Sequence, residues 1–256
     1  MPDLQDLNIK IFADGADLQD IIRLANDPMI QGFTTNPTLM RKANVDDYQA
    51  FSQQVLLIIP DRPVSFEVFS DEFDDMELQA RELASWGNNV YVKIPVTNTR
   101  GEFSGPLVEK LSSDGIQVNV TALMTTNQVR RVASHLSTET NSIVSVFAGR
   151  IADTGRDPVP LMAEAVDILK SRPKAELIWA SPRELLNVFQ ADSVGCQIIT
   201  ATSDVLAKLR LVGKDLDEYS LETAQMFRND ALGAGYTINI SHANNRAVTA
   251  REEVSN

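Results

Sequence analysis

The chain has few of the residues that most often bind metals or form catalytic nucleophile–histidine pairs. It has one cysteine and two histidines in 256 residues. A single cysteine, Cys196, excludes an internal disulfide framework and favours a reducing compartment. His135 and His242 are far apart in the sequence, so we expect neither a histidine-rich metal site nor a Ser-His-Asp triad.

Basic residues and long apolar runs are also scarce. The 23 lysines and arginines are outnumbered by 35 acidic residues, for a net charge of −12, and an acidic protein repels nucleic acid. No apolar run approaches the roughly 20 residues that span a bilayer, and the first ten residues lack the pattern of a secretory signal. We therefore expect a cytoplasmic protein without a nucleic-acid or membrane partner. Small anionic substrates are not excluded, since one local cluster of arginines and backbone N–H groups can bind them.

What the sequence does contain is a regular alternation of short β-rich runs with longer amphipathic segments. Successive runs begin roughly every 20 to 35 residues, the length of one βα unit. The predicted helices include 17–26, 71–86 and 160–171. The eight predicted strands are Asn8 to Ala13, Ile30 to Thr35, Pro63 to Phe69, Val90 to Val96, Gly115 to Thr121, Ser142 to Phe147, Ala175 to Ser181 and Cys196 to Thr200.

About eight βα units in a chain of this length predict an α/β fold of the (β/α)8 TIM-barrel type. An open doubly wound sheet is the alternative, but the glycine-rich phosphate loops that such sheets commonly use, G-x-G-x-x-G and G-x-x-x-x-G-K-[ST], are both absent. A further helix is predicted over 221–232. We expect residues 1–240 to form one domain that includes this helix, followed by a polar, flexible tail over 241–256.

Alternation of side chains along each strand separates an aliphatic face from a face that becomes polar toward the carboxyl end. In the fourth predicted strand, Val90, Val92 and Ile94 share one face, whereas Lys93 lies on the other. Buried polar groups cost free energy unless they are paired. In a barrel the polar positions meet at the C-terminal face, where such enzymes carry out their chemistry. The pattern therefore indicates a catalytic pocket.

Lys93 is the most informative of these positions. Desolvation disfavours the charged form of a buried amine, and a neutral amine can attack a carbonyl carbon to give a carbinolamine and then a Schiff base. Glu67, in the third predicted strand, and Asp14, directly after the first, are candidate proton carriers. The alternative is a lysine at a sheet edge whose ammonium reaches water.

Each of the other polar positions also has a simpler interpretation. Glu67 can be an ion-pair partner of Lys93 and nothing more. Asp14 can cap the first helix, and Asn36 precedes Pro37 as in many ordinary turns.

Further along the chain, Asn119, Thr121 and Ser145 can satisfy one another's hydrogen bonds. Arg150 and Arg183 each follow a predicted strand end. Either one alone would be interpreted as surface, but two at the same end of a barrel are typical of a phosphate clamp.

Six motifs in this order resemble the transaldolase family, and the resemblance extends from about Lys10 to Ile238. The motifs are FADGAD (12–17), GFTTNPTL (32–39), VKIPVT (92–97), VNVTAL (118–123), SVFAGRIADTG (145–155) and WASPRE (179–184).

The resemblance implies a barrel in which Lys93 forms the Schiff base. Glu67 and Thr121 match the pair that holds a catalytic water, and Asp14 matches the acid/base group. The remaining matched positions bind substrate hydroxyls (Asn36 and Asn119), line the pocket (Ser145 and Phe147) and bind phosphate (Arg150, Ser181 and Arg183).

The resemblance implies no metal and no organic cofactor, sugar-phosphate substrates and a homo-oligomer. The family also contains fructose-6-phosphate aldolases, in which the position of Glu67 is typically Gln and that of Phe147 typically Tyr. Glu67 and Phe147 therefore favour a true transaldolase of the pentose phosphate pathway, which transfers a dihydroxyacetone unit between ketose and aldose phosphates. A simple aldolase and a non-catalytic sugar-phosphate binder are the alternatives.

Overall fold

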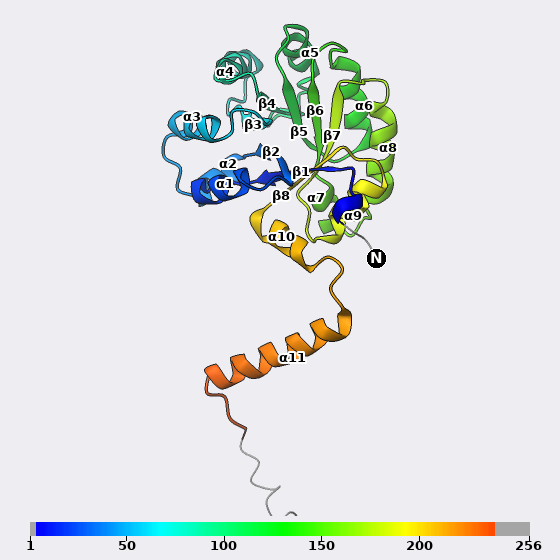
Figure 1. Ribbon diagram of the computed structural model, residues 1–256. Coiled ribbons are helices and arrows are strands. Elements are labelled where there is room, and N and C mark those ends of the chain that lie inside the picture. The colour runs from blue at the N-terminus through cyan, green and yellow to red at the C-terminus, as the bar shows by residue number, and fades with distance from the viewer. Residues whose placement is uncertain (1–3, 239–256) are drawn as a thin grey trace, which may run out of the picture. The chain divides into compact units, whose positions relative to one another are not determined.

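The computed structural model describes residues 4–238, and its first 212 residues form one compact unit. In Figure 1 the strands of this unit lie in the middle and the helices lie outside them. The eight parallel strands close on themselves in sequence order, because β1 pairs with both β2 and β8. The predicted TIM barrel is therefore confirmed. The strands are β1 (Lys10–Asp14), β2 (Ile30–Thr34), β3 (Val64–Glu67), β4 (Val90–Pro95), β5 (Val118–Leu123), β6 (Ser142–Val146), β7 (Ala175–Ala180) and β8 (Ile198–Ala201).

At least one helix follows every strand, and two helices follow each of β2 and β6. Many begin with a side chain that caps the first turn, as Asp47 does for α3 by accepting a hydrogen bond from the Ala50 N–H at 2.9 Å. The helices of this unit are α1 (Leu18–Ala25), α2 (Pro37–Lys42), α3 (Tyr48–Ile58), α4 (Phe73–Ser85), α5 (Gly105–Ser113), α6 (Thr126–His135), α7 (Ala148–Asp153), α8 (Val159–Leu169), α9 (Leu186–Ser193) and α10 (Ser203–Leu206), with 3₁₀ turns η1 (Leu4–Asp6) and η2 (Ala207–Leu211).

Two apolar cores hold the barrel together. The larger lies between the outer strand faces and the helices, and it includes the aliphatic side chains of Val90, Val92 and Ile94. The smaller fills the interior of the barrel with Phe12, Tyr91, Ile143, Ile178, Ala180 and Ile198. This inner core fills the barrel below the C-terminal ends of the strands, on the side of their N-terminal ends. Only the C-terminal ends are therefore left to form a polar pocket.

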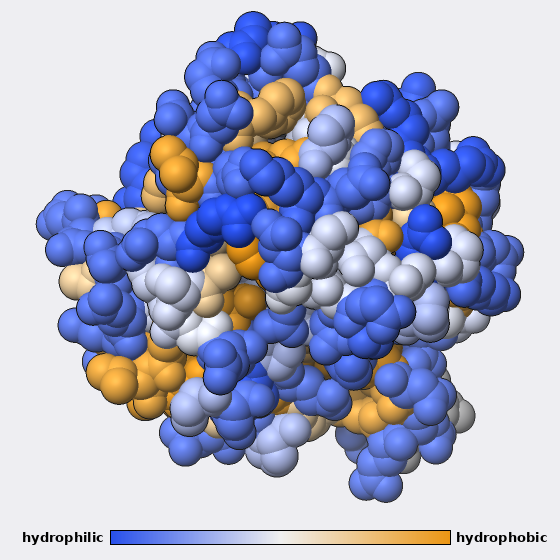
Figure 2. Space-filling view, turned by 90° about the horizontal axis from the view of Figure 1, so that it is seen from above, coloured by the Kyte–Doolittle hydropathy of each residue, from blue (hydrophilic) through white to orange (hydrophobic). Residues whose placement is uncertain are grey.

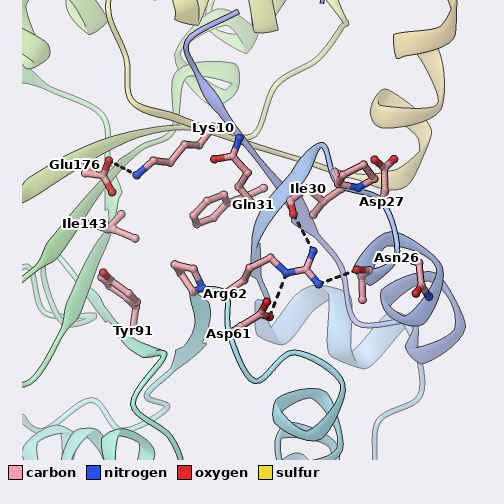
Figure 3. A pocket seen from close by; sticks show the side chains of 14 residues that line it. Lys10, Asn26, Asp27, Ile30, Gln31, Asp61, Arg62, Tyr91, Ile143 and Glu176 are labelled. Atoms are coloured by element: carbon pink, nitrogen blue, oxygen red, sulfur yellow. Dashed lines mark hydrogen bonds and ion pairs between the residues drawn. The ribbon is translucent and has the colours of Figure 1, made fainter. Parts of the chain in front are cut away.

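The opposite, N-terminal mouth of the barrel contains a separate cavity, shown in Figure 3. Its charged side chains pair with one another or with backbone. Lys10 contacts Glu176 at 2.7 Å and so links β1 to β7. The Arg62 guanidinium donates to the carbonyl oxygens of Ile30 and Ala25 at 2.9 and 2.7 Å. These contacts join strands and loops, and we assign them a structural role.

The second unit begins at Gly213, and its main element among the described residues is α11 (Leu216–Gly233). The helix begins five residues before the predicted start at 221. The carboxylate of Asp215 caps it by accepting from the N–H groups of Asp217 and Glu218 at 2.9 and 3.0 Å. The expected single domain over 1–240 stays a prediction, and the expected tail over 241–256 lies outside the described residues.

The surface agrees with the acidic, polar composition. Figure 2 shows a face on which hydrophilic residues predominate and apolar residues form small separate areas. Among the described residues, no helix has the length and apolarity needed to cross a membrane. The expected cytoplasmic location and homo-oligomer stay predictions.

Candidate active site

The carboxyl ends of the strands surround one cavity of about 560 Å³. All eleven side chains predicted to form the site line this cavity, although they come from positions up to 169 residues apart (183 − 14). They are Asp14, Asn36, Glu67, Lys93, Asn119, Thr121, Ser145, Phe147, Arg150, Ser181 and Arg183.

Lys93 lies in the middle of β4, where its side chain is only 8% exposed. The strand register places it opposite Glu67 of β3 and Asn119 of β5. Its Nζ is 3.2 Å from Glu67 Oε2 and donates to the carbonyl oxygen of Thr35 at 2.8 Å. Because the barrel is closed, the strand has no free edge. The interpretation as a sheet-edge lysine that reaches water is therefore wrong.

Asp14 ends β1 and is held by two threonines that sequence reasoning missed. Thr34 donates to Asp14 Oδ1 at 2.8 Å, and the Thr34 and Thr200 hydroxyls are 2.6 Å apart. Burial raises the pKa of Asp14, while the charge of Lys93 and the hydrogen bond from Thr34 act against that rise. A carboxyl group with a raised pKa can both accept and return a proton. Thr34 could have been predicted, since it lies within the GFTTNPTL motif, two residues before Asn36.

Asn36 has a structural role, as the N-cap of α2 rather than as part of an ordinary turn, and it also lines the cavity. Its Oδ1 accepts from the Leu39 N–H at 3.0 Å and so caps α2. Its side chain also hydrogen-bonds to Asp14, an interaction that opposes the rise in the pKa of that carboxyl. Asn36 therefore joins the start of α2 to the acid/base position.

The polar side chains of β5 and β6 form a short chain of hydrogen bonds. Ser145 donates to Asn119 Oδ1 at 2.7 Å, and Asn119 Nδ2 donates to Ser65 Oγ at 3.0 Å. Asn119 and Ser145 thus partly satisfy one another, as the simpler interpretation predicted. Thr121 differs, because within the described residues its buried Oγ1 has no hydrogen-bond partner. A buried hydroxyl of this kind is suited to a water molecule or a substrate.

The two arginines are brought together by a close approach of two backbone segments. A Cβ atom on Gly149 would lie 1.6 Å from the carbonyl oxygen of Ser181, so only glycine fits there. Ser181 itself has a φ of 62°, in the left-handed region. This turn directs Ser181 into the cavity, although strand alternation grouped it with Leu177 and Trp179, which belong to the outer core.

The arginine side chains are held by different contacts. The guanidinium of Arg150 lies 5.0 Å from the ring centre of Phe147. Arg183 Nε donates to Asp153 Oδ1 at 2.9 Å, and its Nη2 also pairs with this carboxylate. Both arginines are exposed at the rim of the cavity, where they can reach a phosphate group of a bound ligand.

His135 and Cys196 lie outside the cavity lining. The imidazole of His135 packs edge-on against Phe103, with 5.3 Å between ring centres. Cys196 is buried, and burial raises the pKa of its thiol to about 12. The thiol therefore behaves as a small core group, as its position in a predicted strand indicated.

Comparison with known proteins identifies a matching family and relatives that are about one third identical in sequence. Residues 11–242 match a family model described as transaldolase/fructose-6-phosphate aldolase. A probable transaldolase of Dehalococcoides mccartyi is 34% identical over 202 residues, covering 78% of this chain and 90% of the relative. A probable transaldolase of Thermoanaerobacter sp. is 32% identical over 231 residues, covering 90% of this chain and all of the relative.

Solved structures at lower sequence identity share the fold alone. The 3-hexulose-6-phosphate synthase of Salmonella typhimurium is 15% identical with a TM-score of 0.54, covering 78% of this chain and 91% of that one. KGPDC of Streptococcus mutans is 9% identical with a TM-score of 0.52, covering 77% and 88%.

Proposed function

Because the chain belongs to the transaldolase/fructose-6-phosphate aldolase family, we propose that it transfers a dihydroxyacetone unit between ketose and aldose phosphates through a Schiff base on Lys93. The contact between Lys93 and Glu67 at 3.2 Å in the floor of the polar cavity is the observation that carries the proposal. Glu67 takes a proton from the ammonium, and the neutral amine attacks the ketone carbon of the donor.

Loss of water from the carbinolamine then gives the imine. Glu67 and Thr121 hold the water that relays the proton, consistent with the buried Thr121 hydroxyl that has no partner among the described residues. Asp14 accepts the proton of the substrate hydroxyl as the adjacent carbon–carbon bond breaks, and the bonding electrons move into the imine to give an enamine. The first aldehyde leaves and a second one enters. The enamine adds to it, Asp14 returns the proton, and hydrolysis frees Lys93.

Sugar phosphates are the substrate class that the rim of the cavity fits best. Arg150, Ser181 and Arg183 bind the phosphate, and Asn36 and Asn119 bind hydroxyls nearer Lys93. The donors are sedoheptulose 7-phosphate or fructose 6-phosphate, and the acceptors are glyceraldehyde 3-phosphate or erythrose 4-phosphate. Positioning two polyols against one imine accelerates the reaction mainly by orientation.

Transfer, rather than simple aldol cleavage, is favoured by Phe147. Its ring lines the cavity beside Arg150 and brings no hydroxyl that could protonate the enamine. The enamine therefore persists until an acceptor aldehyde arrives. We expect fructose 6-phosphate cleavage to stop after one turnover when no acceptor is present. Steady release of glyceraldehyde 3-phosphate without an acceptor would instead identify an aldolase.

Reduction with borohydride in the presence of fructose 6-phosphate tests the proposal. The expected product is one reduced adduct per chain, which mass mapping locates on Lys93. A protein that binds sugar phosphate but forms no adduct would be a non-catalytic binder, contrary to the proposal.

The phosphate clamp makes a separate prediction for Arg183→Ala. Losing a charge-assisted contact is expected to raise KM for fructose 6-phosphate by about 10- to 100-fold, and to change KM for unphosphorylated fructose little. Arg130→Ala is a matched control, because Arg130 is another half-exposed arginine with one carboxylate partner, Glu164. An unchanged KM for the phosphorylated substrate would contradict the clamp.

A further inference from the structure

The backbone of Glu67 lacks a strand partner on one side. In the β3 segment, the backbone groups of residues 63, 65 and 67 point toward β2. Phe33 N donates to Pro63 O at 2.8 Å, and Thr35 N donates to Ser65 O at 3.2 Å. The pairing of β2 with β3 ends at Ser65. β2 itself ends at Thr34, and α2 begins three residues later. The N–H and C=O of Glu67 therefore extend past the end of the neighbouring strand.

One side-chain hydroxyl takes the place of that missing strand. Tyr48 OH donates to the carbonyl oxygen of Glu67 at 3.1 Å and accepts from the Glu67 N–H at 2.9 Å. A phenol can do both at once, since its oxygen is a donor and an acceptor. On its other side β3 is paired normally, with Val68 N donating to Lys93 O at 3.2 Å.

The tyrosine ring is itself held firmly. Tyr48 is the first residue of α3, directly after the capping residue Asp47. Three aromatic rings surround it, with ring centres 4.5 Å away for Phe69, 6.1 Å for Trp86 and 6.3 Å for Phe66. Burial raises the pKa of the Tyr48 hydroxyl well above its ordinary value. The phenol therefore stays neutral and keeps both of its hydrogen-bonding roles across the working pH range.

We propose that Tyr48 is a positioning residue, whose hydroxyl fixes the backbone of Glu67 so that the carboxylate stays within reach of Lys93. The inference rests on the proposed function of Glu67. Without the hydroxyl, two part-buried backbone groups would lose their partner, and the end of β3 would shift or admit water to satisfy them. The Glu67 carboxylate would move with the backbone, away from its contact with the lysine.

Tyr48→Phe removes the hydroxyl and keeps the ring among its aromatic neighbours. We expect kcat to fall by about 10- to 100-fold, as a displacement on the order of 1 Å can cause, while KM for fructose 6-phosphate changes less than about twofold, since Tyr48 does not line the cavity. Tyr91→Phe is the matched control, because Tyr91 is another tyrosine with little exposure, is hydrogen-bonded to Asn141, and lines the N-terminal cavity instead. An equal loss of kcat in Tyr91→Phe would overturn the proposal.

A double-mutant cycle with Glu67→Ala separates positioning from a general structural effect. The readout is the single-turnover rate at which the Lys93 adduct forms. If Tyr48 acts through Glu67, Tyr48→Phe slows this rate in the native background but by less than about twofold in the Glu67→Ala background. If Tyr48→Phe slows adduct formation equally in both backgrounds, or does not slow it in the native one, the role of Tyr48 is overturned and the proposed role of Glu67 stands. An unchanged rate in Glu67→Ala by itself would overturn the proposed role of Glu67 and, with it, that of Tyr48.

Discussion

Lys93→Ala is expected to form no borohydride adduct with fructose 6-phosphate and to lose turnover by about 10⁴-fold or more, the scale seen when a covalent nucleophile is removed. The physical reason is that no neighbouring group can replace the amine. Glu67 and Asp14 are carboxylates, and Thr121 offers a hydroxyl with no base of its own. Mass mapping of the reduced protein, together with the rate of aldose phosphate formation, measures the effect.

Lys42 provides the control for this experiment. It also lines the cavity, from the end of α2, but its side chain is exposed and its ammonium is hydrated. Lys42→Ala should therefore keep the adduct at the same site. An adduct that persists in Lys93→Ala, or that disappears in Lys42→Ala, would contradict the assignment of the nucleophile.

Substitution of Lys93 also leaves the Glu67 carboxylate without its cationic neighbour. Glu67 is only 19% exposed in its side chain, so the loss of the partner is expected to lower stability. Circular dichroism and the melting temperature should be measured on Lys93→Ala and on Lys93→Met, which preserves most of the volume. If both variants fold and neither forms the adduct, the loss of activity is chemical.

Much of the barrel could be predicted because its signals are local in sequence. Each strand is a short β-rich run with an aliphatic outer face, and seven of the eight observed strands begin within two residues of the predicted start. The exception is β5, which was predicted to start at Gly115 but starts at Val118. Gly115 has a φ of 84° and belongs to the preceding turn. α11 begins earlier than predicted because Asp215 supplies a cap that apolar periodicity does not reveal.

The site was predictable where strand alternation and motif agreed, as for Lys93 and Asn119. Alternation failed for Ser181, whose left-handed backbone redirects the side chain. It also could not reveal contacts made between distant segments. Thr200 reaches Asp14 only through Thr34, and Tyr48 reaches Glu67 of β3 from helix α3. Such contacts depend on where the pairing of two neighbouring strands ends, as that of β2 and β3 does at Ser65. That point is set by the closed barrel and cannot be inferred from one segment of the sequence.

Asp14→Asn is expected to make the protein less active and more stable. The substitution keeps an oxygen that can accept the hydrogen bond from Thr34, so the geometry is preserved. It removes the group that takes and returns the substrate proton. A loss of about 10²- to 10⁴-fold in kcat is expected, with trapping of the Lys93 adduct still possible because the imine forms before the carbon–carbon bond breaks.

The stability effect follows from the direction of the pKa shift. Burial raises the pKa of Asp14 above its ordinary value of 3.8, so between 3.8 and the raised value the folded state binds more protons than the unfolded state. The free energy of unfolding contributed by this group therefore falls as pH rises through that window, and the loss is complete above it. Asparagine does not titrate. Asp14→Asn should melt higher than the native protein at pH 7, by about 2 to 4 °C per kcal/mol gained, and this advantage should vanish below pH 3.8.

A second aspartate makes the opposite prediction and so serves as the control. A hydrogen bond from Thr202 lowers the pKa of Asp204, so ionised Asp204 contributes stability at neutral pH that is lost as the pH falls. Asp204→Asn should therefore melt lower than the native protein at pH 7, with unchanged kcat, because Asp204 lies outside the lining of the catalytic cavity. Equal melting shifts in the two variants, or an Asp14→Asn advantage that did not depend on pH, would contradict the idea that a carboxylate destabilised by burial is retained at the end of β1 for proton transfer.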